Sequence, residues 1–128
     1  MNQAMYFRVE GCFKPYVRMT QKGKWVKPDA QEYLSSQHRI AHGLKAIMAE
    51  NGWTMIPKGK SLSVTLGIHH SHGVHGRDLD NETKAIIDSA QGIVFANDQW
   101  IDQITTFRQR GSECYFILYV HDWEEDAE

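Results

Sequence analysis

The sequence predicts an α+β fold in which two helices pack on one mixed sheet. Three observations indicate it. Apolar and polar residues alternate over residues 61–68, apolar residues recur at helical spacing over residues 28–51, and two apolar or β-branched segments follow near the end of the chain. With a first strand at 4–9 and a second helix at 81–90, the element order is β-α-β-α-β-β. This order is typical of helices packed on a single sheet.

The first half of the chain contains a strand, a basic segment and a long helix. Residues 4–9, Ala-Met-Tyr-Phe-Arg-Val, indicate the strand. Residues 12–28 are basic and carry aromatic side chains between the charges. Pro28 and Asp29 can open a helix, because proline is tolerated in the first turn and Asp favours the positive helix end. Gly52 suits the left-handed position after a helix, so we expect this helix to end at Asn51.

The second half contains a strand, a second helix and two further strands. The strand at 61–68 leads into the His- and Gly-rich residues 69–77, which predict a flexible loop. The helix runs from about Asn81 to Ala90, and Gly92 ends it. Residues 100–109 and 113–121 predict two strands, and the turn residues 110–112 between them predict a hairpin.

The length of 128 residues predicts one domain, over residues 1–122. We expect the acidic tail at residues 123–128 to be disordered. No apolar run reaches the roughly 18 residues of a membrane span, and the beginning of the sequence lacks a signal-peptide pattern, so we expect a cytoplasmic protein. Cys12 and Cys114 lack CxxC spacing, and we expect both to be reduced thiols outside any metal or redox motif.

The charge is distributed unevenly along the chain. Residues 1–60 hold ten Lys and Arg against four Asp and Glu, whereas residues 61–128 hold four against twelve. The basic half is suited to contact phosphate, with Tyr16 or Trp25 stacking on an unpaired base. The alternatives remain that basic and acidic surfaces simply alternate, and that the aromatics pack back on the core.

The most informative residues lie between positions 78 and 98. Asp78 and Asp80 are two apart, so an extended backbone points both to one side. Asp80, Lys84 and Asp88 are each four apart, which stacks them on one helix face, and Asp98 follows. Clustered carboxylates repel one another unless a cation lies between them, and hard oxygen ligands suit Mg²⁺ or Mn²⁺. The pattern predicts metal-assisted cleavage of a phosphodiester, against the alternative of a solvated helix face with ion pairs.

Residues 78–101 also resemble a known family. The pattern Asp78-Leu79-Asp80-Asn81-x-x-Lys84-x-x-x-Asp88-x-x-x-Gly92, then Asn97-Asp98-x-x-Ile101, is similar to the signature of the RusA-type Holliday junction resolvases. The basic residues 11–28 resemble the family's early loop more weakly. The resemblance implies a bacterial or phage endonuclease of DNA recombination and repair, with one RusA-like nuclease domain. It implies a homodimer that binds four-way junctions and nicks symmetrically related strands using Mg²⁺, for which Mn²⁺ substitutes.

The resemblance also implies residue roles. Asp78, Asp80 and Asp98 match the metal-binding carboxylates, and Lys84 matches an essential lysine suited to stabilise transition-state charge or orient water. The residues expected to contact DNA are Lys14, Arg18, Lys22, Lys24 and Arg77. Asn81 and Asp88 are expected to contact and orient the metal-binding residues without binding the metal themselves. Asn97 stands where the family often has a second Asp, which removes one negative charge near the site.

Two other functions stay open. One is a junction-binding protein with weak or no cleavage, which Asn97 favours; the other is an enzyme for a small phosphorylated substrate, against which the basic aromatic segment argues. Imidazole also binds Zn²⁺ or Ni²⁺, but no cysteine or fixed ligand pair accompanies the histidines of residues 69–77 in the sequence. We therefore expect that segment to be a mobile loop near the DNA.

Overall fold

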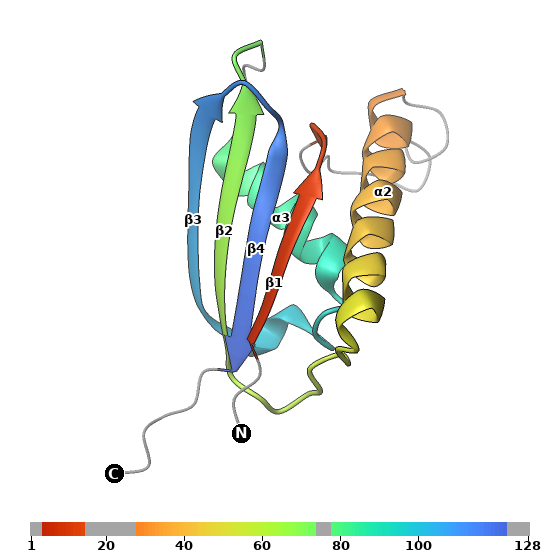
Figure 1. Cartoon of the computed structure of the whole chain (residues 1–128), viewed down its shortest axis with the longest axis vertical. Helices are drawn as coiled ribbons and strands as arrows, with labels where there is room; N and C mark the ends of the chain where they lie inside the picture. Colours follow the sequence, from red (N-terminus) through yellow and green to blue (C-terminus); the bar gives the residue numbers. More distant parts are fainter. Residues whose placement is uncertain (1–3, 15–27, 74–77, 123–128) are drawn as a thin grey trace.

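The computed structural model describes residues 4–14, 28–73 and 78–122 (Figure 1). Its elements, in chain order, are β1 (Ala4–Glu10), α2 (Pro28–Asn51), β2 (Leu62–Ser71), α3 (Leu79–Ala90), the short 3₁₀ helix η1 (Asp98–Trp100), β3 (Ile101–Gly111) and β4 (Tyr115–Asp122). The predicted α+β class and the order β-α-β-α-β-β are confirmed. The predicted disordered tail at 123–128 lies outside the described residues. No helix in the described ranges is long and apolar enough to cross a membrane.

The four strands form one mixed sheet in the order β1-β4-β2-β3. β4 runs antiparallel to β1 and β2, and β3 runs parallel to β2 from the pair Leu62–Ile101 to the pair Ser71–Gly111. The predicted hairpin between the last two strands is therefore wrong, because β2 lies between them. The three residues at 112–114 are long enough to cross over β2, since two strand spacings amount to roughly 10 Å.

β2 is longer than the sequence predicted. It continues through His69, His70 and Ser71, which were expected to belong to a flexible loop. Both neighbouring strands pair with this extension: His69 faces Tyr115 of β4, and His70 faces Arg110 of β3. The polar composition of the segment suggested a loop, but pairing on both edges holds it in the sheet.

Both helices cover the same face of the sheet, and the core lies between the two layers (Figure 1). Phe7, Leu66 and Leu118 of the sheet are fully buried there, as is Leu44 of α2, and Ile86 of α3 packs with them. Alternating side chains of β1, β2 and β4 supply this layer, which is the pattern that the sequence predicted for β2. α3 begins at Leu79, two residues before the predicted start, whereas α2 has the predicted bounds.

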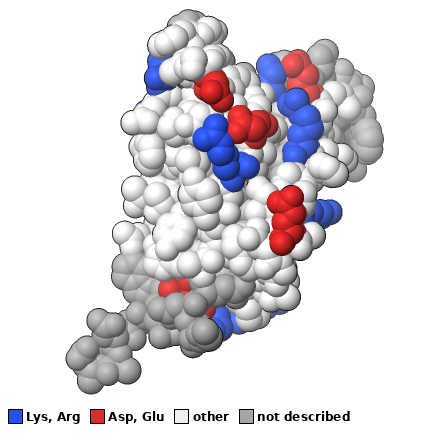
Figure 2. Space-filling model, viewed as in Figure 1, with Lys and Arg blue, Asp and Glu red and all other residues white. Residues whose placement is uncertain are grey.

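The opposite face of the sheet has no described helix over it. Tyr6, Phe107 and Tyr119 remain 54%, 42% and 39% exposed on the surface. Figure 2 shows this face, on which Lys, Arg, Asp and Glu gather mainly toward one end and leave most of the surface uncharged. The Phe107 ring lies against Gly67, where a Cβ atom would come within 2.7 Å of the ring.

The cysteines differ from the expectation. Cys12 and Cys114 form a disulfide, with Cα atoms 5.0 Å apart and a sequence separation of 102. The expectation of reduced thiols was wrong because the antiparallel neighbours β1 and β4 bring the two positions together, which sequence spacing does not show. Gly11 turns the chain after β1 with a φ of 130°, and its N–H donates to the Cys114 carbonyl at 2.9 Å.

Candidate functional site

Asp78 and Asp80 lie at the beginning of α3. Asp78 is the residue before the first turn, with extended backbone angles, and its carbonyl accepts the Glu82 N–H at 3.1 Å. Its side chain makes no capping hydrogen bond, although Asp is well suited to that role. Both carboxylates are exposed. They stand at the N-terminal end of α3 and are accessible to a ligand.

Lys84 lies one turn further along α3 and forms an ion pair with Asp88. Its Nζ atom is 3.5 Å from an Asp88 oxygen, and the two side chains are 50% and 29% exposed. An exposed pair four residues apart contributes only a few tenths of a kcal/mol, roughly 0.3–0.5, to stability. The pair therefore positions the Lys84 ammonium on the helix face that begins with Asp80 more than it stabilises the fold.

Asp98 begins η1, and the neighbouring residues fix its backbone. The Asn97 side-chain oxygen accepts the Gln99 N–H at 2.9 Å and caps the short helix. The Asp98 N–H donates to the Gln91 side-chain oxygen at 3.1 Å. Gln91 is the residue after α3, so Asp98 lies at the C-terminal end of that helix. Its carboxylate is exposed.

Within one chain, the predicted metal ligands lie at two separate positions: Asp78 and Asp80 at the start of α3, and Asp98 beyond its end. Asp80 and Gln91 are 11 positions apart in the sequence, which is roughly 16 Å along a helix axis. The sheet topology leads to the same separation. Strands β2 and β3 are parallel neighbours, and Asp98 lies just before the start of β3, whereas Asp78 follows the opposite end of β2 (Figure 1). Oxygens that share one Mg²⁺ ion lie within about 4 Å of each other. Asp98 cannot reach the ion that Asp78 and Asp80 of the same chain would hold.

The structure adds a buried polar group that the sequence reading missed. Glu82 of α3 and His70 of β2 are each 3% exposed, and His70 Nε2 contacts a Glu82 carboxylate oxygen. The other Glu82 oxygen accepts from Arg108 of β3 at 3.1 Å. The only signal in the sequence was a carboxylate on the apolar side of the predicted helix, at the position between Leu79 and Ile86.

The structure describes one of the five predicted DNA-contacting residues. The Lys14 backbone N–H donates to the Ser36 hydroxyl at 2.8 Å, and its Nζ lies 3.3 Å from Glu32. This holds the end of the basic segment against α2. The other four, Arg18, Lys22, Lys24 and Arg77, lie outside the described residues.

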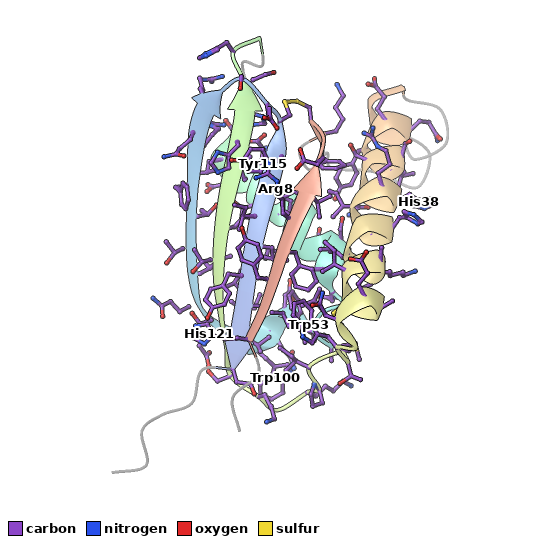
Figure 3. The ribbon with its side chains drawn as sticks, viewed as in Figure 1. Arg8, His38, Trp53, Trp100, Tyr115 and His121 are labelled. Carbon is purple, nitrogen blue, oxygen red and sulfur yellow. A yellow bond between two sulfur atoms is a disulfide. The ribbon has the colours of Figure 1, made fainter. Side chains whose placement is uncertain are left out.

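Another cation on the described surface, Arg8, belongs to the open sheet face. Its guanidinium lies 3.7 Å from the centre of the Tyr115 ring, and the two side chains meet in Figure 3. A hydrogen bond with the Glu10 carboxylate raises the pKa of Arg8, with Glu113 also nearby. Two carboxylates thus partly neutralise this charge, which makes it a poor phosphate ligand.

Comparison with known proteins gives one result that covers most of the chain. The family model described as endodeoxyribonuclease RusA matches residues 6–116. A search of curated proteins returned no match. The matched range includes the basic segment, the beginning of α3 and the Asp98 segment.

Proposed function

This chain belongs to the RusA family of endodeoxyribonucleases, and we propose that it is a metal-dependent resolvase of four-way DNA junctions. On this proposal it binds the junction and introduces paired symmetric nicks. The observation that supports it best is the start of α3, where Asp78 and Asp80 are exposed, Asp78 makes no side-chain capping bond, and Lys84 follows Asp80 by one helical turn.

The donor set fits Mg²⁺. Carboxylate oxygens are hard ligands, and Mg²⁺ binds through one or two carboxylates while it keeps several waters and takes up phosphate oxygens. When bound, the ion supplies a polarised phosphate and a water of lowered pKa. Asp78 and Asp80 would hold it, and the Lys84 ammonium would stabilise negative charge that develops on the phosphate. The ion pair with the Asp88 carboxylate keeps the Lys84 ammonium on the helix face that begins with Asp80.

The position of Asp98 supports a homodimer as part of the same proposal. Its carboxylate is exposed but lies at the far end of α3 from Asp78 and Asp80. A second copy that brings its own Asp98 to the start of α3 would complete the ligand set. Two-fold symmetry then gives two identical composite sites, which suits paired cuts in symmetrically related strands.

The basic segment supplies the proposed DNA contacts. Lys14, Arg18, Lys22, Lys24 and Arg77 would bind phosphates, which position the junction without reading its sequence. The ion pair of Lys14 with Glu32 anchors one end of the segment to α2.

The alternative is a junction-binding protein with weak or no cleavage. Asn97 favours it, because its amide caps η1 beside Asp98 and contributes no negative charge for a cation. This alternative retains the same DNA surface and differs only in the chemistry.

A cleavage assay separates the two. A labelled four-way junction and a linear duplex of matched sequence are incubated with the protein and Mg²⁺, Mn²⁺ or EDTA, beside Asp80→Asn. Glu50→Gln, a similarly isosteric change at an exposed position of α2, serves as the control. The resolvase requires metal-dependent paired nicks in the junction that Asp80→Asn abolishes and Glu50→Gln preserves. Tight junction binding with no cutting under any metal supports the alternative.

A further inference from the structure

Two cysteine sulfurs and an imidazole meet at the end of the sheet where β1 and β2 end and β4 begins. One ligand atom from each of Cys12, His70 and Cys114 lies within 4.8 Å of the others. The sulfurs are seen together in Figure 3 as the yellow bond near one end of the sheet. We propose that these three residues bind a Zn²⁺ ion when the disulfide is reduced.

The His70 ring is prepared to act as a ligand. Its Nε2 atom contacts Glu82, whereas its Nδ1 atom is buried and has no hydrogen-bond partner among the residues that the structure describes. A buried polar atom without a partner is unfavourable, because it has lost its hydrogen bonds to water. With the proton on Nε2 held by the carboxylate, Nδ1 presents a lone pair, which is the state in which imidazole binds a metal.

Glu82 and Arg108 complete the support behind this ligand. A metal-bound histidine commonly donates its other ring N–H to a carboxylate, which fixes the tautomer and makes the ligand more basic. Glu82 is in place to accept that proton, and Arg108 holds its second oxygen at 3.1 Å. The three residues come from β2, α3 and β3, so the orientation of the His70 ring is set by the core of the fold.

The surroundings of Cys114 suit a negatively charged sulfur. The Ser71 N–H donates to Cys114 Sγ at 3.4 Å, and the Ser71 hydroxyl lies at the same distance. Donors of this kind stabilise a thiolate. A pocket lined by Gly11, His70 and Glu82, among others, lies beside the cluster.

The donor set selects the ion. Two thiolates and one imidazole favour Zn²⁺ over Mg²⁺, which prefers oxygen ligands. Three protein ligands leave the fourth tetrahedral position open to water. The site is therefore distinct in chemistry from the carboxylates at Asp78 and Asp80, and it stands whether or not the chain is a nuclease.

The disulfide and the zinc site exclude each other. A dithiol reductant transfers two electrons and two protons to the Cys12–Cys114 bond, giving two thiols and an oxidised, cyclic reductant. Zinc binding then releases the two thiol protons, because the ligands are thiolates. The sulfurs separate by rotation of their side chains to make room for the ion between them.

Cobalt substitution tests the proposal. The full chain is reduced, freed of reductant without oxygen, and titrated with Co²⁺. We expect one equivalent to give a sulfur-to-cobalt charge-transfer band and tetrahedral visible bands, both removed by one equivalent of Zn²⁺. Cys12→Ser and Cys114→Ser should lose the charge-transfer intensity in whole or part. Glu82→Gln should retain the band with an affinity about 10–100-fold weaker.

Two controls locate the ion, and the wild-type chain alone can overturn the proposal. His69→Gln changes the neighbouring histidine, which is not part of the cluster, and Asp80→Asn changes the carboxylate site; both should retain the wild-type spectrum. The oxidised chain should show no charge-transfer band. A reduced wild-type chain that is folded by circular dichroism but binds Co²⁺ without such a band contradicts the proposal, whatever the variants do.

Discussion

Asp80 and Asp98 lie at opposite ends of α3. Asp80 is in the first turn of the helix, and the Asp98 N–H bonds to Gln91 just after the last. The arrangement follows from the β2-α3-β3 crossover, because a helix that connects two parallel strands runs from the end of the first strand back to the level at which both strands begin. Residues after β2 and residues before β3 therefore cannot meet within one chain. Any site that needs both residues must draw on two copies.

Replacing Lys84 tests catalysis separately from folding. We expect Lys84→Met to slow junction cutting by roughly 100-fold or more, since it removes a charge that stabilises the transition state. The free energy of unfolding should change by less than about 0.5 kcal/mol, because the lost ion pair with Asp88 is exposed. Single-turnover cleavage and urea unfolding measure the two effects. Lys45→Met, at an exposed position of α2, should change neither.

Replacing Asn97 tests the effect of the missing charge. Asp caps a helix as well as Asn does, so Asn97→Asp should preserve the bond to Gln99 and the fold. An added charge close to a cation in a solvated site contributes about 1 kcal/mol. The Mg²⁺ concentration for half-maximal cutting should therefore fall by about fivefold. An unchanged Mg²⁺ requirement in a folded variant would mean that position 97 lies far from the ion.

Replacing Glu82 tests the buried polar group. Glu82→Ala leaves His70 and Arg108 without their shared carboxylate, and breaking a buried charged contact of this kind costs about 3–5 kcal/mol. Urea unfolding of the oxidised chain measures the loss without interference from zinc. Glu50→Ala on the exposed side of α2 should stay within about 0.5 kcal/mol of the parent chain. A loss equally small at Glu82 would argue against the buried contact.

Replacing a lysine of the basic segment tests DNA contact. A Lys22→Ala variant should bind junctions more weakly at low salt and reduce the slope of log affinity against log salt by about one, as expected for one lost phosphate contact. Lys58→Ala, an exposed lysine outside the segment, should leave the slope unchanged. An identical slope in both variants would remove Lys22 from the interface.

Local patterns in the sequence predicted the elements but not their pairing. Alternation over residues 61–68 gave β2, and helical spacing gave α2 and α3, because side-chain periodicity follows directly from backbone geometry. The hairpin between β3 and β4 was wrong because turn residues such as Gly111 permit a reversal without choosing the partner strand.

For the candidate site, too, the sequence predicted local spacing but not contacts between distant segments. The spacing of Asp80, Lys84 and Asp88 predicted a shared helix face, and the helix places them so. No pattern predicted that Cys12, His70 and Cys114 would meet, since their proximity depends on the order β1-β4-β2 in the sheet. The distance of Asp98 from Asp80 likewise depends on β3 being parallel to β2, which the sequence does not show.

Mixing two inactive variants tests the composite site most directly. We expect the Asp80→Asn chain and the Asp98→Asn chain each to be inactive alone. The two are combined, refolded together and assayed on a labelled junction with Mg²⁺. Our account predicts recovered cutting, as single nicks. In a mixed dimer the intact Asp78 and Asp80 of one chain meet the intact Asp98 of the other, so one site is complete. A mixture that forms dimers but stays inactive would contradict it, because each chain would then have to supply its whole site alone.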